Sequence, residues 1–231
     1  MNHTEQKRAL KRTRIFEKLS DEAHAEIAQL VHWKEYRKGV EAVSYKDTGK
    51  EVYFLAEGRV RATIFSFSGK EISYQELSPG SMFGELSAID GQPRTANVIT
   101  MEPSLIGSIS GKDLWTLIHK YPEVSAGVLQ RLAALVRFLS DRVYQYGALD
   151  VKDRVRAEVL RLARENMTDG KSATVSKMPT HAEIANRINT HREAVTRELN
   201  ELSRLGIVDQ NKRVLTIADV GALAELLPED I

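Results

Sequence analysis

The sequence predicts an α+β protein built from a small antiparallel β-roll, a long helix, and a C-terminal group of short helices with a hairpin. Between Gly39 and Ser110, short runs of alternating apolar and polar residues are separated by turn residues, a pattern typical of small antiparallel sheets. Between 112 and 148, apolar residues recur at helical spacing. From Thr180 onward, two helix starts are followed by two short strand-like runs.

Length and composition bound the class of protein. A chain of 231 residues has room for one or two domains with cores of their own. Its net charge of +1 gives no information about its partners. The absence of cysteine excludes disulfides, thiolate zinc sites and iron–sulfur clusters. No apolar run reaches the roughly 18 residues of a membrane helix, and the N-terminus lacks the apolar stretch of a signal peptide. We therefore expect a cytoplasmic protein with no membrane partner.

The first half of the chain begins with a helix and continues as strands. Ser20 is a suitable N-cap for a helix whose apolar residues include Ile27 and Leu30. Pro79 and Gly80 suit the two central positions of a type II turn. Strands are expected within the ranges 52–55, 60–65, 72–74, 96–99 and 105–109.

The helical stretch after the roll carries a narrow apolar seam with spacings of three and four residues, which favours a dimeric coiled coil. A helix that packs against the protein's own core is the alternative, although such a helix has a wider apolar stripe. We divide the chain into a roll domain (1–120), a dimerisation helix (121–149) and a C-terminal domain (150–231). The seam consists of Leu129, Leu132, Val136, Leu139, Val143 and Tyr146.

The segment from Phe83 to Ala96 has the chemistry of a phosphate site. Gly84 permits close approach of the backbone, and a helical turn after it would direct N–H groups at an anion. Arg94 offers a fork of donors for phosphate oxygens, and Thr95 adds a hydroxyl. Glu85 would instead suit a sugar hydroxyl. The alternative is a simple turn followed by a Glu85–Arg94 ion pair.

The residues Phe-Gly-Glu-Leu-Ser and Pro-Arg-Thr-Ala resemble the phosphate-binding cassette of cyclic-nucleotide-binding domains. Nearly the whole chain resembles the cyclic-AMP receptor branch of the cyclic-AMP receptor protein and fumarate–nitrate regulator family. The resemblance implies cyclic AMP, or cyclic GMP, as allosteric ligand, with Glu85 on the ribose 2′-hydroxyl and Arg94 on the phosphate. The full implied ligand site is Gly84, Glu85, Leu86, Ser87, Arg94, Thr95, Ala96, Leu139 and Ser140.

Recognition of the base departs from the family pattern. Two adjacent hydroxyl residues of the long helix read adenine in the family, and Ser140 falls on one of those positions. Leu139 falls on the other and has no hydroxyl group. Cyclic GMP therefore stays open beside cyclic AMP.

The C-terminal residues predict a helix-turn-helix. Thr180 and Glu183 form a capping box, and Thr190 and Glu193 repeat the same pattern shortly afterwards. Asn189 tolerates the left-handed backbone that the turn requires. Residues 207–217 read as two strands around a polar turn, which is the wing of a winged helix-turn-helix. Any small helical hairpin is the alternative.

The second helix carries side chains suited to base edges in double-stranded DNA. Arginine can donate two hydrogen bonds to guanine, and glutamate can accept one from the amino group of cytosine. The resemblance implies that Arg192, Glu193 and Arg197 recognise the bases of the half-site. A solvated Glu193–Arg197 pair is the alternative. Arg187 and Arg204 are further candidates for phosphate contact. The predicted DNA-binding residues are Thr180, His191, Arg192, Glu193, Thr196, Arg197, Lys212 and Arg213.

An enzymatic role is not expected. A metalloenzyme with a similar roll needs histidine ligands inside it, and none of the six histidines lies between Gly39 and Ser110. We predict no catalytic residue and no metal. The expected function is that of a homodimeric, cyclic-nucleotide-gated transcription regulator that binds a near-palindromic site and contacts RNA polymerase. The alternatives are a regulator with a non-nucleotide effector or constitutive activity, and a module that acts on a protein partner.

Overall fold

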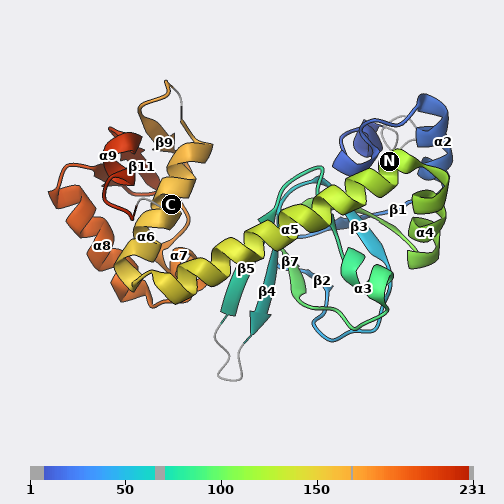
Figure 1. Cartoon of the computed structure of the whole chain (residues 1–231), viewed down its shortest axis with the longest axis horizontal. Coiled ribbons are helices and arrows are strands. Elements are labelled where there is room, and N and C mark those ends of the chain that lie inside the picture. Colours follow the sequence, from blue (N-terminus) through green and yellow to red (C-terminus); the bar gives the residue numbers. More distant parts are fainter. Residues whose placement is uncertain (1–7, 66–70, 168, 229–231) are drawn as a thin grey trace. The chain divides into compact units, whose positions relative to one another are not determined.

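The computed structural model describes residues 8–65, 71–167 and 169–228. The chain divides into two compact units, 1–136 and 137–231, and the division falls inside the long helix α5 (Pro122–Ala148) (Figure 1). Helices and antiparallel sheets occur in both units, which confirms the α+β class. Within the described residues, no helix combines the length and hydropathy needed to span a membrane.

The first unit is a roll of two four-stranded antiparallel sheets. One sheet has the order β1-β8-β3-β6 and the other has the order β2-β7-β4-β5. Each sheet therefore combines strands that lie far apart in the sequence. The strands are β1 (His32–Tyr36), β2 (Glu41–Val43), β3 (Val52–Glu57), β4 (Val60–Phe65), β5 (Glu71–Leu77), β6 (Met82–Phe83), β7 (Asn97–Thr100) and β8 (Ser104–Ile109).

Short helices close the roll around an apolar core. Phe16 and Phe54 meet edge to face at 5.0 Å in this core, and both are fully buried. Ser20 accepts from the backbone N–H of Ala23 at 3.3 Å, which confirms it as an N-cap. Gly80 has φ +88°, as a type II turn requires. The helices are η1 (Arg14–Phe16), α2 (Asp21–Leu30), α3 (Glu85–Asp90), α4 (Gly111–Lys120) and α5.

The first unit contains strands that the sequence prediction omits: β1, and the short strands β2 and β6. The roll begins at strand β1, before Gly39, so His32 does lie in a roll strand, paired with Ser108 of β8. The side chain of His32 is exposed, and the described residues contain no cluster of three or more metal-ligating side chains. The helical stretch after the roll is two helices, because Tyr121 adopts an extended backbone between α4 and α5.

The second unit has its own sheet and core. The sheet has the order β10-β11-β9, so a strand that precedes the two central helices completes the wing. Arg156 of α6 and Glu198 of α8 form a buried ion pair at 2.6 Å. The elements after α5 are α6 (Val151–Glu165), β9 (Ala173–Val175), α7 (His181–Arg187), α8 (Arg192–Arg204), β10 (Val208–Asn211), β11 (Val214–Ile217) and α9 (Val220–Ala224).

The first helix and the turn of the helix-turn-helix form as predicted, but the start of the second helix differs from the prediction. Both hydrogen bonds of the capping box between Thr180 and Glu183 are present, and Asn189 is left-handed with φ +50°. The second capping box is wrong. The backbone N–H of Thr190 donates to Ala185 at 2.9 Å, so this residue still belongs to the turn, and α8 begins only after the N-cap His191, which makes no side-chain cap bond.

Candidate ligand pocket and DNA-binding surface

Seven of the predicted ligand residues line a single cavity in the first unit. They are Gly84, Glu85, Leu86, Ser87, Arg94, Thr95 and Ala96, and they come from the start of α3 and the segment before β7. Residues of both sheets and of α5 complete the walls: Val43, Ala62, Gln75, Leu77, Phe83, Val98, Arg131 and Leu135. The fold therefore brings the cassette together around a hollow next to the long helix.

Arg94 is buried in this cavity, with a side chain only 3% exposed. Its Nη1 donates to the carbonyl of Gly84 at 2.8 Å, and its Nη2 donates to the carbonyl of Glu51 at 2.9 Å. Nη2 also lies 3.2 Å from the Glu51 carboxylate. The Nε atom is buried without a hydrogen-bond partner. A buried guanidinium with a spare donor is suited to an anion that enters the cavity.

Gly84 has a conformation and a neighbourhood that favour glycine. Its φ is +80°, and it stands at the N-cap of α3. A Cβ added there would lie 2.8 Å from Nη1 of Arg94 and 3.0 Å from the carbonyl oxygen of Glu51. A larger residue would therefore push against the guanidinium that the cavity presents.

Glu85 and Arg131 form an ion pair across the same cavity. The Glu85 carboxylate is buried and lies 3.4 Å from Nε of Arg131. Burial raises the pKa of the Glu85 carboxyl, while the charge of Arg131 offsets part of this effect. Nη2 of Arg131 also donates to Gln75 of strand β5 at 3.3 Å. Glu85, which is expected to bind the ribose 2′-hydroxyl, is thus paired with a cationic side chain of helix α5.

The cavity is small in this structure. Its volume is about 70 Å³, which is room for about five water molecules at the 10–15 Å³ that each one needs. A nucleotide is larger than the space inside these walls. Side chains of the two ion pairs, Glu51–Arg94 and Glu85–Arg131, contribute to or flank those walls.

The two residues expected to read the base lie in the other unit. Leu139 and Ser140 are exposed on the part of α5 that belongs to the second unit, and the described lining of the cavity comes from the first unit. Neither residue is part of the described lining of the cavity.

Most of the predicted seam is exposed apolar surface on α5. Leu129, Val136 and Val143 are each more than 60% exposed, and Leu139 is 43% exposed. Leu132 differs, because it packs against the core of the roll. Tyr146 also differs, because its hydroxyl donates to the carbonyl of Arg187 at 3.0 Å.

The predicted DNA-binding residues fall into two groups. The exposed group lies at the start of α8 and at the turn of the wing: His191, Arg192, Glu193, Arg197 and Lys212. Lys212 has φ +54°, so it occupies the left-handed position of the hairpin turn. These side chains are available to a partner.

The second group already has partners within the chain. Thr180 belongs to the capping box, and Arg213 donates to the carbonyl of Met178 at 3.2 Å. Thr196 lies 2.8 Å from Nδ1 of His181. Arg187 does not suit phosphate contact, because its side chain is buried and pairs with Glu158 at 3.0 Å. Arg204 is exposed and pairs with Glu201.

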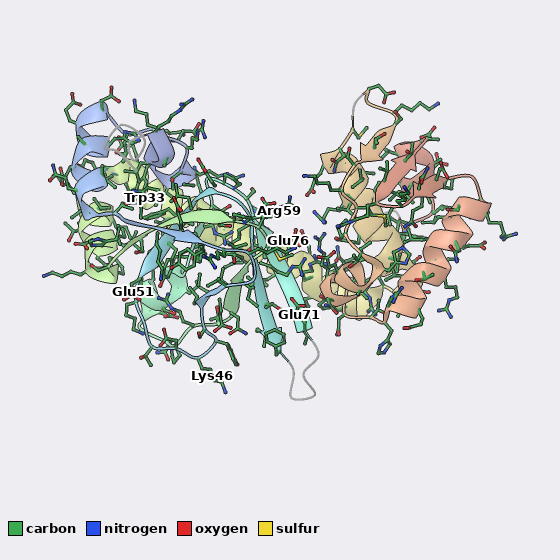
Figure 2. All side chains as sticks on the ribbon, turned by 180° about the vertical axis from the view of Figure 1, so that it is seen from behind. Trp33, Lys46, Glu51, Arg59, Glu71 and Glu76 are labelled. Carbon is green, nitrogen blue, oxygen red and sulfur yellow. The ribbon has the colours of Figure 1, made fainter. Side chains whose placement is uncertain are left out.

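Sequence reasoning missed Glu51 and Arg131. Both reach the cassette from distant segments, so no local motif contains them. Arg131 left no distinct signal, because both residues between Leu129 and Leu132 are polar, as in any amphipathic helix. Glu51, which directly precedes strand β3 and is labelled in Figure 2, left none.

Two family models match this chain. A cyclic nucleotide-binding domain matches residues 33–121, and a Crp-like helix-turn-helix domain matches residues 130–226. A CRP-like cAMP-activated global transcriptional regulator of Mycobacterium tuberculosis is 27% identical over 216 residues, which cover 93% of this chain and 96% of that protein. The cyclic AMP receptor protein of Thermus thermophilus is 26% identical, covering 83% of this chain and 86% of the other.

The fold itself recurs in a solved structure. A CooA mutant from Carboxydothermus hydrogenoformans superimposes with a TM-score of 0.80 at 20% identity, covering 93% of this chain and 95% of the other. The matched domains and relatives are those of transcription regulators and not of enzymes. From its roll, its long helix and its winged helix-turn-helix, the chain belongs to the CRP family of cyclic-nucleotide-binding, DNA-binding transcription regulators.

Proposed function

We propose that a cyclic nucleotide binds in the roll and controls the affinity of a homodimer for a near-palindromic DNA site. Cyclic AMP is the expected effector and cyclic GMP is the competitor. The observation that carries the proposal is Arg94, buried with a partnerless Nε in a cavity that also holds the buried carboxylate of Glu85. The names of the relatives, a cAMP-activated regulator and a cyclic AMP receptor protein, support the same ligand class.

The ligand contacts follow from the chemistry of the cavity. Arg94 would donate to the cyclic phosphate, assisted by Thr95 and by backbone N–H groups from Gly84 to Ser87. Glu85 would accept from the ribose 2′-hydroxyl. Leu139 supplies no hydroxyl for the base, so Ser140 alone would hydrogen-bond it. Selection of adenine over guanine would then be weaker than with two hydroxyl groups.

The exposed seam supports dimerisation. Leu129, Val136, Leu139 and Val143 leave one apolar stripe of α5 uncovered in a single chain. A second copy with the same stripe would cover it by coiled-coil packing. The functional parts would be the roll (1–120), the dimerisation helix (121–149) and the DNA-binding domain (150–231).

DNA recognition would come from the exposed start of α8. Arg192 and Arg197 would fork onto guanine, Glu193 would accept from cytosine, and Lys212 would contact a phosphate. Two such helices in a dimer would enter successive major grooves about 34–36 Å apart. Binding near promoters in the cytoplasm would bring the dimer to RNA polymerase.

A second candidate is a regulator of the same fold that needs no nucleotide. The small cavity and the internal partners of Arg94 and Glu85 favour it, because both groups expected on the ligand are already neutralised. Such a protein would bind its DNA site equally well with and without cyclic nucleotide.

Titration calorimetry with cyclic AMP, and separately with cyclic GMP, decides between them. We expect binding of one or both by the wild-type protein and none by Arg94→Ala. Arg59→Ala, which removes an exposed arginine of the roll outside the cavity, is the control and should bind as the wild type does. If neither nucleotide gives heat, control by a cyclic nucleotide is rejected, the proposed DNA binding is unaffected, and the second candidate is favoured.

A further inference from the structure

Arg94 already has an anionic neighbour at the candidate pocket. Oε2 of Glu51 lies 3.2 Å from Nη2 of Arg94, and the backbone carbonyl of Glu51 accepts from the same nitrogen at 2.9 Å. The Glu51 side chain is 53% exposed, whereas that of Arg94 is 3% exposed. The carboxylate therefore reaches the buried guanidinium from the solvent side, at the residue that directly precedes strand β3.

A second carboxylate approaches the same point. A Cβ added at Gly49 would lie 2.8 Å from Oε2 of Glu51, 2.9 Å from Oδ2 of Asp47 and 3.4 Å from Nη2 of Arg94. The backbone N–H of Arg94 also donates to the carbonyl of Asp47 at 2.8 Å. The backbone N–H of Lys46 donates to the carbonyl of Arg94 at 2.9 Å. The two backbone hydrogen bonds hold the loop beside Arg94, so its acidic side chains contribute to the electrostatic potential at the pocket.

The carboxylate of Glu51 also acts on its surroundings. Burial raises the pKa of the Tyr53 hydroxyl, and the charge of Glu51 raises it further, while the charge of Arg94 lowers it. The negative charge of Glu51 therefore affects groups inside the roll as well as groups at its surface. An anion bound to Arg94 would be exposed to the same field.

We propose that Glu51 makes the pocket selective for phosphodiesters over phosphomonoesters. This inference rests on the proposed function. A cyclic phosphate carries one negative charge, whereas a 5′-monophosphate carries close to two at pH 7, because its second pKa is about 6. Repulsion from a fixed carboxylate grows in proportion to the ligand's charge. Glu51 thus weakens the binding of a linear nucleotide more than that of its cyclic form.

Glu51→Gln tests the charge with little change of shape. The amide oxygen can still accept from Arg94, and the backbone carbonyl that holds Nη2 is unchanged. Calorimetry with cyclic AMP and with 5′-AMP, backed by displacement of a fluorescent cyclic nucleotide for weak binding, gives both affinities. Glu57→Gln, which neutralises an exposed carboxylate at the end of strand β3, is the matched control.

In Glu51→Gln we expect cyclic AMP to bind about threefold tighter and 5′-AMP about tenfold tighter, so the preference for the cyclic form falls by about threefold. At pH 5, where 5′-AMP is mostly a monoanion, the extra gain should disappear. A structural role for Glu51 would shift both ligands equally at both pH values, and equal shifts or no shift would overturn the proposal. If the wild-type protein binds no cyclic nucleotide, the proposed function fails and this inference fails with it.

Discussion

The hydroxyl of Tyr146 donates a hydrogen bond of 3.0 Å to the backbone carbonyl of Arg187. Tyr146 lies near the C-terminal end of α5, and Arg187 is the last residue of α7. The side chain of Arg187 pairs in turn with Glu158 of α6. The end of the long helix is therefore joined to the first helix of the helix-turn-helix through named polar contacts, and not by chain connectivity alone.

Tyr146→Phe removes the hydrogen bond and keeps the ring. The net value of one such bond is about 0.5–1.5 kcal/mol. If the bond forms only in the DNA-binding state, its loss should weaken DNA binding by the ligand-saturated protein by about two- to tenfold. Fluorescence anisotropy with labelled operator DNA measures this change. Tyr45→Phe, at an exposed tyrosine of the first unit, should have no effect. Unchanged DNA affinity in Tyr146→Phe would show that this contact does not contribute to the DNA-competent state.

Gly84→Ala should impair ligand binding. The new Cβ would lie 2.8 Å from Nη1 of Arg94, and φ of +80° strains any L-residue there. We expect at least tenfold weaker nucleotide binding in calorimetry, together with a lower thermal midpoint for the roll. Gly91→Ala is a matched control, because Gly91 also has positive φ (+72°) but nothing lies within 4 Å of its added Cβ. Equal ligand affinities for the two variants would contradict the role given to Gly84.

A charge in the exposed seam should separate the subunits. Leu139→Asp or Val143→Asp would bury a carboxylate in the apolar interface of a dimer, which costs several kcal/mol. Sedimentation velocity should show a monomer for either variant and a dimer for the wild type. Leu205→Asp, at a leucine of the second unit that is 48% exposed, should remain dimeric. A dimer in all three variants would place the interface elsewhere.

Two substitutions separate base recognition from phosphate binding. Glu193→Ala should relax discrimination at one base pair by about 1–3 kcal/mol, because the acceptor for a cytosine amino group is lost. Lys212→Asn should weaken all DNA sequences alike and lower the salt dependence by about one counterion, while asparagine tolerates the left-handed turn. Affinities for a panel of operators at several salt concentrations measure both effects. An unchanged sequence preference in Glu193→Ala would refute its role in recognition.

Glu158 should make the second unit sensitive to acid. Burial alone would raise the pKa of Glu158, but hydrogen bonds and charges of Arg161 and Arg187 outweigh burial and lower it. A folded-state pKa below the unfolded value of about 4.3 gives stability at neutral pH that is lost as the pH falls through the folded pKa. Urea midpoints from pH 7 to 3 should therefore fall for the wild type.

Glu158→Gln provides the comparison. It should be less stable by about 3–5 kcal/mol at pH 7, because two arginines lose a buried partner, and the difference from wild type should shrink toward pH 3. Glu165→Gln removes the exposed partner of Arg161 and should change stability by less than about 1 kcal/mol. A difference that stays constant with pH would contradict the ionised state assigned to Glu158.

The sequence predicts those parts of the fold that depend on local patterns. Thr180 and Glu183 cap α7, Asn189 turns the chain, and Gly80 closes a type II turn, because each needs only near neighbours. Strand β1 was missed because its pairing with β8, more than 60 residues away, decides its structure. The second capping box failed because Thr190 is held in the turn by Ala185.

The candidate site was predictable in the same uneven way. The cassette from Gly84 to Ala96 is contiguous, so its members could be listed from the sequence, and they line one cavity. The partners that set its charge, Glu51 and Arg131, come from other elements and are visible only after folding. Arg187 was wrongly expected to contact DNA. Its side chain is instead buried in the second unit, where it forms an ion pair with Glu158.

The buried apolar residues form cores that each stay within one unit: the cluster around Leu160 and Leu199 runs from Leu149 to Leu227, and those of the roll end at Val128. Proteins with separate cores often depart from two-state unfolding, so we expect two calorimetric transitions instead of one. If the two units were uncoupled, a nucleotide held by the roll would raise only the transition of the roll, and operator DNA only that of the second unit. A shift in the melting temperature of the unit that does not bind the added ligand would then measure the coupling between the effector site and the DNA-binding site.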